Sequence, residues 1–174
     1  MYESKPCSQF IIAKMKTIAK VKIYSSPPEV VFQKIDDLGV TGMHMTKSSM
    51  MMMGSKLDLE YLTESRKGLG TRYRWKGKMM GMIMDFTVEV TEWVYGSYKT
   101  WETIGHSKLI IYSWYRMHLE VLNTPRGTLA ELSITYKRPK GFFYEVLSFL
   151  FADLYCWWCL KHMLDDAEIA VNKI

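Results

Sequence analysis

The stretch FFYEVLSFLFADLYCWWCLKHML, residues 142–164, predicts one long helix and decides the fold. From Gly141 to Ile174 the chain has no proline and no further glycine. A continuous helix over this length would measure roughly 50 Å at 1.5 Å per residue. A surface helix ordinarily carries one apolar stripe, whereas this one is apolar on nearly three sides. We therefore expect it to cover a hydrophobic cavity and to present a second apolar side to something else.

The composition fits a single globular domain with a core of its own. The chain has 174 residues, of which 48% are hydrophobic and 24% charged, both ordinary values for a soluble protein. Its 14 methionines and its aromatic share of 14% are high. Methionine adapts to irregular spaces, so this bias is typical of either a malleable pocket or a methionine-rich core.

The charge pattern argues against a nucleic-acid partner. The net charge is +5, and the lysines and arginines are spread along the chain instead of clustering as a basic face would require. The most basic segment, residues 66–78, alternates basic and aromatic side chains, as a strand with one solvated face does. With three cysteines, no signal-peptide core and no uncharged run of 18 residues, we expect a cytoplasmic protein without a membrane span.

Periodicity divides the chain into elements. Residues 1–14 are expected to be a leader, and residues 15–174 one domain. Residues 15–25 alternate as a strand, and residues 29–37 follow a helix start. A short second helix is favoured around 42–53, with a strand as the alternative. Further strands are expected at 56–64, 69–77, 81–93, 97–104, 107–122 and 127–138.

Short connections make neighbouring strands antiparallel. One of these connections is expected to be a hairpin turn at Gly105, with His106 exposed beside it. Alternation then selects one face of each strand for burial. This inward face comprises Leu57, Leu59, Tyr61, Tyr73, Trp75, Met82, Met84, Phe86, Val88, Val90, Tyr115, Met117, Leu119, Ala130, Leu132, Ile134 and Tyr136.

The order of elements predicts an α+β helix-grip fold. In this class a curved antiparallel sheet, here of about seven strands, wraps a long C-terminal helix, and one or two short helices follow the first strand. The chain resembles the START-like (SRPBCC) superfamily over roughly residues 15–172. The resemblance is carried by IYSSPPEVVFQKIDD (23–37), by GLGTRYRWKGKMMG (68–81) leading into MDFTVEVTEWV (84–94), and by GTLAELSITYKRPKGFF (127–143).

The resemblance implies a binding fold. The superfamily includes lipid carriers, hormone and sterol binders, and polyketide cyclases and aromatases. Because it has no shared catalytic motif, no catalytic residue can be carried over. The expected function is binding or transport of an apolar or amphipathic small molecule, lipid-like or polycyclic. The alternatives are a cyclase- or aromatase-type enzyme, which is less favoured, and an interaction module that uses the C-terminal helix.

We expect the ligand to lie between the sheet and the long helix, in a pocket of several hundred Å³. No catalytic residue, metal ion or cofactor is expected. The predicted ligand-binding residues are Tyr61, Tyr73, Trp75, Met84, Phe86, Met117, Ile134, Leu150, Asp153 and Trp157.

Asp153 is the most unusual of these residues. On a helical wheel it falls in the middle of the face that is expected to pack on the sheet. That face comprises Phe142, Val146, Leu150, Trp157, Leu160 and Leu164. A carboxylate placed there must be paired, hydrogen-bonded or protonated. A basic or tyrosine partner from a strand or loop is favoured. A ligand-anchoring or acid–base role and a different phase of the helix are the alternatives.

Two further features of the helix leave alternatives open. Cys156 and Cys159 are interpreted as packing residues, although a metal or redox role is not excluded by their spacing. The opposite side of the helix carries a second apolar stripe made of Tyr144, Leu147, Phe151 and Trp158. This stripe is expected to be covered by residues 1–14 or the short helices, to form a homodimer, or to contact a membrane or another protein. The role of the methionine run at 50–53 is undefined.

Overall fold

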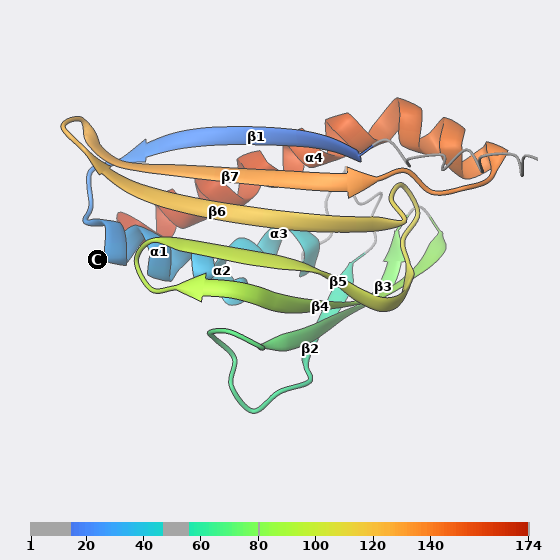
Figure 1. The fold of residues 1–174 in the computed structure, drawn as a ribbon, viewed down its shortest axis with the longest axis horizontal. Helices are drawn as coiled ribbons and strands as arrows, with labels where there is room; N and C mark the ends of the chain where they lie inside the picture. Colours follow the sequence, from blue (N-terminus) through green and yellow to red (C-terminus); the bar gives the residue numbers. More distant parts are fainter. Residues whose placement is uncertain (1–14, 47–55, 80, 174) are drawn as a thin grey trace, which may run out of the picture.

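A seven-stranded antiparallel sheet and one long helix make up most of the molecule (Figure 1). The structure, a computed structural model, describes residues 15–46, 56–79 and 81–173. The predicted leader and the methionine run lie outside the described residues. The strand order is β1-β7-β6-β5-β4-β3-β2, so the first two strands of the chain form the two edges of the sheet.

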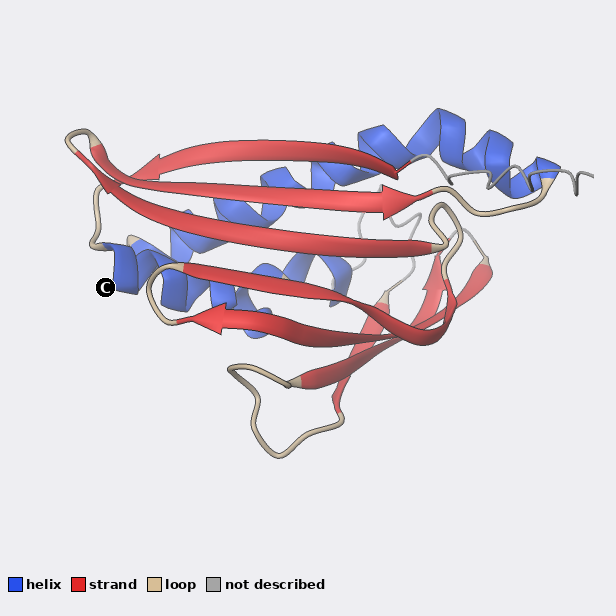
Figure 2. Cartoon of the chain, viewed as in Figure 1, coloured by secondary structure: helices blue, strands red, loops and turns tan. Residues whose placement is uncertain are grey.

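The described residues form eleven elements in the expected order. The strands are β1 (Met15–Tyr24), β2 (Leu57–Tyr61), β3 (Arg72–Met79), β4 (Met82–Val94), β5 (Tyr98–Lys108), β6 (Trp114–Thr124) and β7 (Gly127–Lys137). The helices are α1 (Pro28–Asp36), α2 (Leu38–Thr41), α3 (Met43–Thr46) and α4 (Phe142–Val171). Figure 2 shows all the helices on one face of the curved sheet. The predicted helix-grip architecture is therefore confirmed.

The alternation of apolar and polar side chains along the strands predicted which residues form the core. Every residue of the predicted inward face is buried except Leu59, Tyr61 and Met82, which are partly buried and pack against the core. The agreement follows from sheet geometry, because successive side chains of a strand point to opposite faces and only one face meets the helices.

Two local predictions differ from the structure. The helix favoured at 42–53 is confirmed over α3, but the chain is already helical in α2, which ends before Gly42; residues 47–53 of the predicted helix lie outside the described residues. A Cβ at Gly42 would come within 3.0 Å of the Trp75 ring, so glycine lets the chain pass close to β3. Gly105 does not form a hairpin turn. It takes a φ of 64° within β5, which continues to Lys108, and the exposed His106 lies in that strand.

Edge strand β1 is fastened to α4 by polar contacts. The Lys22 ammonium lies 2.6 Å from Asp165 and 2.7 Å from Glu168. Further along β1, the Tyr24 hydroxyl donates a hydrogen bond of 2.8 Å to the Leu164 carbonyl. These contacts hold the C-terminal half of α4 against the sheet.

The phase of α4 differs from the prediction by roughly 70° about the helix axis at 100° per residue. The buried face comprises Ser148, Ala152, Cys156, Cys159, Leu160, Met163, Leu164, Ala167 and Val171. Leu160 and Leu164 were expected there, but Phe142, Val146, Leu150 and Trp157 are exposed. Small side chains fill the buried face of the first half, because they let the helix approach the sheet closely. The prediction gave most weight to bulky apolar residues, and it therefore assigned the wrong side of α4 to the core.

Asp153 has the kind of partners that were expected but not the expected burial. It forms an ion pair with Lys16 of β1, and the Tyr136 hydroxyl of β7 donates it a hydrogen bond of 2.5 Å. The hydrogen bond from Lys16, followed by that from Tyr136, holds the pKa of the carboxyl below its usual range. Its side chain is 46% exposed at the edge of the sheet. The rotation of α4 explains this position.

Candidate functional site

A cavity lies between the sheet and the helices, and its volume is about 60 Å³. It is thus several-fold smaller than the pocket predicted from the sequence. Its walls come from the short helices, from five strands, from the connection between β5 and β6, and from α4. The lining residues are Leu38, Thr41, Gly42, Met45, Tyr73, Trp75, Met84, Phe86, Trp101, Leu109, Tyr112, Tyr115, Met117, Ile134, Tyr155, Cys159 and Met163.

Six of the ten predicted ligand-binding residues line this cavity, and all six belong to strands: Tyr73, Trp75, Met84, Phe86, Met117 and Ile134. Tyr61 lies behind them, with its ring centroid 6.4 Å from that of Tyr73. The three residues predicted from α4 lie elsewhere. Leu150 and Trp157 are exposed, and Asp153 is paired with Lys16 and hydrogen-bonded by Tyr136. Their predicted place on the cavity wall is therefore wrong.

Aromatic rings in contact with one another form much of the wall. Edge-to-face pairs join Phe86 to Tyr115 at 5.9 Å and Tyr73 to Trp75 at 6.5 Å between ring centroids. Tyr112 lies 6.3 Å from Tyr115 and 6.2 Å from Tyr155. Such packed rings keep a wall in shape while presenting a broad apolar surface.

The polar groups of the wall are mostly tyrosine hydroxyls. Four tyrosines line the cavity, and the hydroxyl of one of them, Tyr112, lies 3.3 Å from the Cys156 sulfur. Burial raises the pKa of Tyr73, Tyr112 and Tyr115 far above the usual value of 10.0. These hydroxyls are therefore protonated at neutral pH and can donate hydrogen bonds to an acceptor inside the cavity.

A surface groove of about 530 Å³ adjoins the cavity. Leu109 and Tyr112, from the connection between β5 and β6, line both spaces and so form the wall between them. The groove is bounded on its other side by Pro139, Lys140 and Tyr144, where β7 leads into α4. A movement of Leu109 and Tyr112 would join the cavity to the groove.

The sequence did not identify several of the lining residues. Tyr112 was assigned to a continuous strand over 107–122, whereas it lies in a connection. Tyr155, Cys159 and Met163 lie on the true inner face of α4, and the signal for that face was the spacing of small residues such as Ser148 and Ala152. Trp101 lies on the inward face of β5, for which no inward residues were selected.

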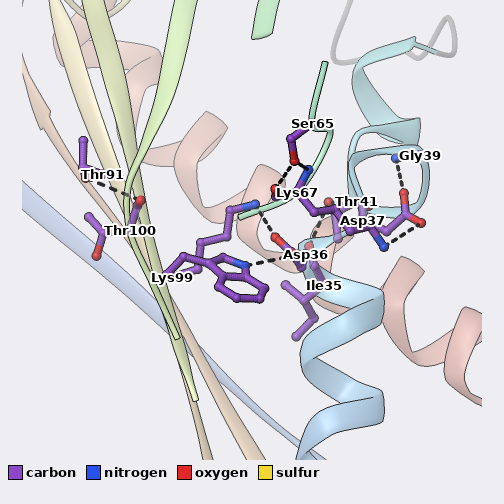
Figure 3. Close-up of polar contacts among 11 residues, drawn as sticks. Ile35, Asp36, Asp37, Gly39, Thr41, Ser65, Lys67, Thr91, Lys99 and Thr100 are labelled. Atoms are coloured by element: carbon purple, nitrogen blue, oxygen red, sulfur yellow. Dashed lines mark hydrogen bonds and ion pairs between the residues drawn. The ribbon is translucent and has the colours of Figure 1, made fainter. Parts of the chain in front are cut away.

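A buried ion pair next to the cavity was also missed (Figure 3). The Lys99 ammonium of β5 lies 2.7 Å from a carboxylate oxygen of Asp36, the last residue of α1. Their side chains are only 5% and 4% exposed. The indole of Trp93 donates a further hydrogen bond of 3.4 Å to Asp36. Lys99 also lies 4.8 Å from the ring of Trp101, so the pair supports one wall of the cavity from behind.

The cysteine pair of α4 is buried. Burial raises the pKa of Cys156 to about 12 and that of Cys159 further. Within the described residues there is no group of three or more histidine, cysteine, aspartate or glutamate side chains that could hold a metal ion. The surroundings of both thiols favour the packing interpretation.

We expect both thiols to be inert in the folded protein, because the thiolate is the reactive form and little of it exists here. In a Cys7→Ser background, which removes the third thiol, alkylation at mildly alkaline pH should be at least about 100-fold slower in buffer than in urea. Modification is measured by intact-protein mass spectrometry. Equal rates in buffer and urea would contradict the buried, protonated state.

Comparisons with known proteins bear on the fold. No protein-family model matches the chain, and no curated protein matches its sequence. Among solved structures, the protein TTHA0849 from Thermus thermophilus superposes with a TM-score of 0.67 at 20% identity, covering 91% of this chain and 98% of that one. The chain is also similar to norcoclaurine synthase from Thalictrum flavum in complex with dopamine and hydroxybenzaldehyde (TM-score 0.65, 13% identity, 99% and 98% covered).

A third similar structure is the Zhui aromatase/cyclase from Streptomyces sp. R1128, with a TM-score of 0.63 at 12% identity and 89% and 94% of the two chains covered. Likeness at such low identity shows the fold and does not transfer an activity. The chain therefore shares the helix-grip fold of these structures, as the resemblance implied.

Proposed function

We propose that the protein binds an apolar or amphipathic small molecule between the sheet and α4. The observation that carries this proposal is the cavity wall, in which aromatic rings and methionines provide the surface and tyrosine hydroxyls provide the polar groups. Small-molecule sites combine a mostly apolar lining with a few polar groups that orient the ligand. The wall fits that description.

The proposed ligand is neutral, flat or compact, and carries an acceptor oxygen such as a carbonyl or ether. Protonated tyrosine hydroxyls can donate to such an oxygen. The apolar rings would make a charged group costly to bury. Because the cavity measures about 60 Å³ while the adjoining groove measures about 530 Å³, a ligand of ordinary size would place one end in the cavity. Its remainder would extend past Tyr112 into the groove.

Binding is favoured over catalysis by the titratable groups of the wall, which are tyrosines and Cys159 with raised pKa values. General acid–base catalysts work best with a pKa near the operating pH. The second candidate, a cyclase- or aromatase-type reaction, draws its support from the fold shared with the Zhui aromatase/cyclase and with norcoclaurine synthase. A cytoplasmic location stays a prediction.

Native mass spectrometry of the protein purified from its own host tests the proposal. We expect a co-purifying neutral molecule that is released by denaturation and extracted into organic solvent. The extracted molecule, added back to stripped protein, separates the two candidates, since a binding protein returns it unchanged and an enzyme converts it. Finding no bound molecule, together with no binding from a panel of aromatic and lipid-like compounds, would refute ligand binding.

A further inference from the structure

The first half of α4 exposes a continuous run of large apolar side chains, which we name the α4 apolar face. Its members are Phe142, Phe143, Tyr144, Val146, Phe149, Leu150, Phe151, Leu154 and Trp157. Phe142 is 86% exposed and Phe149 is 68% exposed. Soluble monomers rarely leave so many neighbouring large apolar side chains in water, and larger patches mark interaction sites.

This face is broader than the stripe predicted from the sequence. Tyr144 and Phe151 of that stripe are exposed, whereas Leu147 and Trp158 are partly buried against the core. The rotation of α4 instead brings residues such as Phe149 and Leu150 outward. Figure 1 shows the first turns of the helix extending past the ends of β1 and β7, where no strand covers them.

Basic side chains border the α4 apolar face. The Lys20 ammonium lies 4.2 Å from the ring centroid of Trp157, and the Arg138 guanidinium lies 5.5 Å from that of Phe149. Lys140 is exposed in the same connection between β7 and α4 as Arg138, whereas the Lys137 ammonium lies 4.9 Å from the ring centroid of Trp114. The acidic groups on this half of the helix are Glu145, which is exposed, and Asp153, which Lys16 neutralises. The border is therefore net positive.

The helix as a whole is long and apolar enough to cross a bilayer. Only 28% of its most apolar 18-residue stretch is buried in the protein. Its C-terminal half is fixed to the sheet by Lys22 and Tyr24. The helix can therefore lie against a bilayer with its first half while its second half stays in the fold, as interfacial amphipathic helices do.

Charge selects among the possible occupants of this face. A second copy of the chain in a twofold dimer would bring the same basic border against itself, with like charges opposed. Residues 1–14 carry two lysines and one glutamate, so they do not complement a basic border either. An anionic lipid surface matches both the apolar side chains and the cations.

We propose that the α4 apolar face docks on the surface of an anionic lipid bilayer, with its aromatic side chains in the interfacial layer and its basic border on the lipid headgroups. Tyr144 belongs both to this face and to the groove that adjoins the cavity. The groove therefore opens beside the docked surface. The docking stands independently of ligand binding, and its failure would leave the proposed function untouched.

Sedimentation of the full chain with vesicles tests the docking. We expect binding to vesicles of phosphatidylserine and phosphatidylcholine, much less binding to pure phosphatidylcholine, and weakening as salt is raised. The variant Phe149→Glu/Leu150→Glu should bind more than about tenfold more weakly, because two apolar side chains that would be buried in the bilayer are lost. Its matched control is Leu69→Glu, a side chain 70% exposed in the connection between β2 and β3, away from α4.

A second pair of variants tests the basic border. Arg138→Ala/Lys140→Ala should weaken binding to anionic vesicles about 30-fold, since each cation near such a surface contributes about 1 kcal/mol. Lys76→Ala/Lys78→Ala, exposed on β3, should have little effect. All four variants change exposed side chains, so thermal unfolding should match the parent. Because the basic-border pair leaves every apolar side chain of α4 in place, it still tests the proposal if the glutamate variant fails to fold.

Three results would overturn the docking. The first is a full chain that stays in the supernatant with anionic vesicles. The second is equal binding to neutral and anionic vesicles, which would remove the role of the basic border. The third is a dimer in analytical ultracentrifugation that the Phe149→Glu/Leu150→Glu variant abolishes, without any vesicle binding by the parent.

Discussion

Replacing Asp36 with alanine is expected to lower the free energy of unfolding by about 3–5 kcal/mol, because it leaves a buried charge without its partner. Lys99 is almost fully buried, and Asp36 is its only ion-pair partner among the described residues. Burial already lowers the pKa of Lys99 from its usual 10.5, and the neighbouring carboxylate works against that shift. Equilibrium unfolding in urea measures the loss.

Two variants serve as controls for this result. Glu102→Ala breaks the Glu102–Arg116 pair on the outer face of the sheet, where Arg116 is half exposed. That loss should be about 1 kcal/mol or less, as for surface pairs generally. The double variant Asp36→Leu/Lys99→Met should recover much of the stability lost in Asp36→Ala, since apolar residues of similar size can replace a buried pair.

The pH dependence of Asp36→Ala carries a defined sign. Without the carboxylate, the pKa of Lys99 in the folded protein should fall further below its unfolded value of 10.5. The folded state then binds fewer protons than the unfolded state between those two values, so stability rises with pH in that window. The deficit of the variant should shrink as the pH rises towards 10.5. A loss below about 1 kcal/mol at neutral pH would show that the pair is not desolvated.

The sequence predicted the sheet and its core side well, for a physical reason. A strand has a side-chain period of two, so residues such as Tyr73 and Trp75 disclose both the element and the face that is buried. Six cavity residues were predicted in this way. The exceptions on β5 show the limit: Gly105 was assigned to a turn because glycine often marks one, yet a strand can continue through a glycine with positive φ.

The helix and the ion pair were less predictable. A helix that is apolar on nearly all sides gives its length but not its phase, and the small residues Ala152 and Cys156 determined the phase here. Hydrophobic weighting therefore placed Leu150 and Trp157 on the wrong side. The Asp36–Lys99 pair joins positions 63 residues apart, and no local pattern relates them. The spacing of strands and helices did not predict how small the cavity is.

Replacing Ile134 with tryptophan is expected to abolish ligand binding, with an affinity loss of at least about 100-fold, or about 2.7 kcal/mol. Ile134 lies on β7 opposite Met117 of β6, and both line the cavity. The indole would occupy the space of about 60 Å³ that the ligand end requires. Overfilling a packed core costs about 1–3 kcal/mol, so the variant should still fold. Isothermal titration with the ligand extracted from the parent protein measures the effect.

The matched control for this variant is Ile104→Trp. Ile104 is partly buried on β5 and faces away from Trp101, so the same enlargement there should leave the cavity and the affinity unchanged. Ile134→Ala provides the converse, because it enlarges the cavity and destabilises the fold by about 2–5 kcal/mol. It should retain binding, and ligand addition should raise its free energy of unfolding more than that of the parent. If Ile134→Trp binds as tightly as the parent, the ligand does not enter the cavity, and the groove beside Tyr112 becomes the whole site.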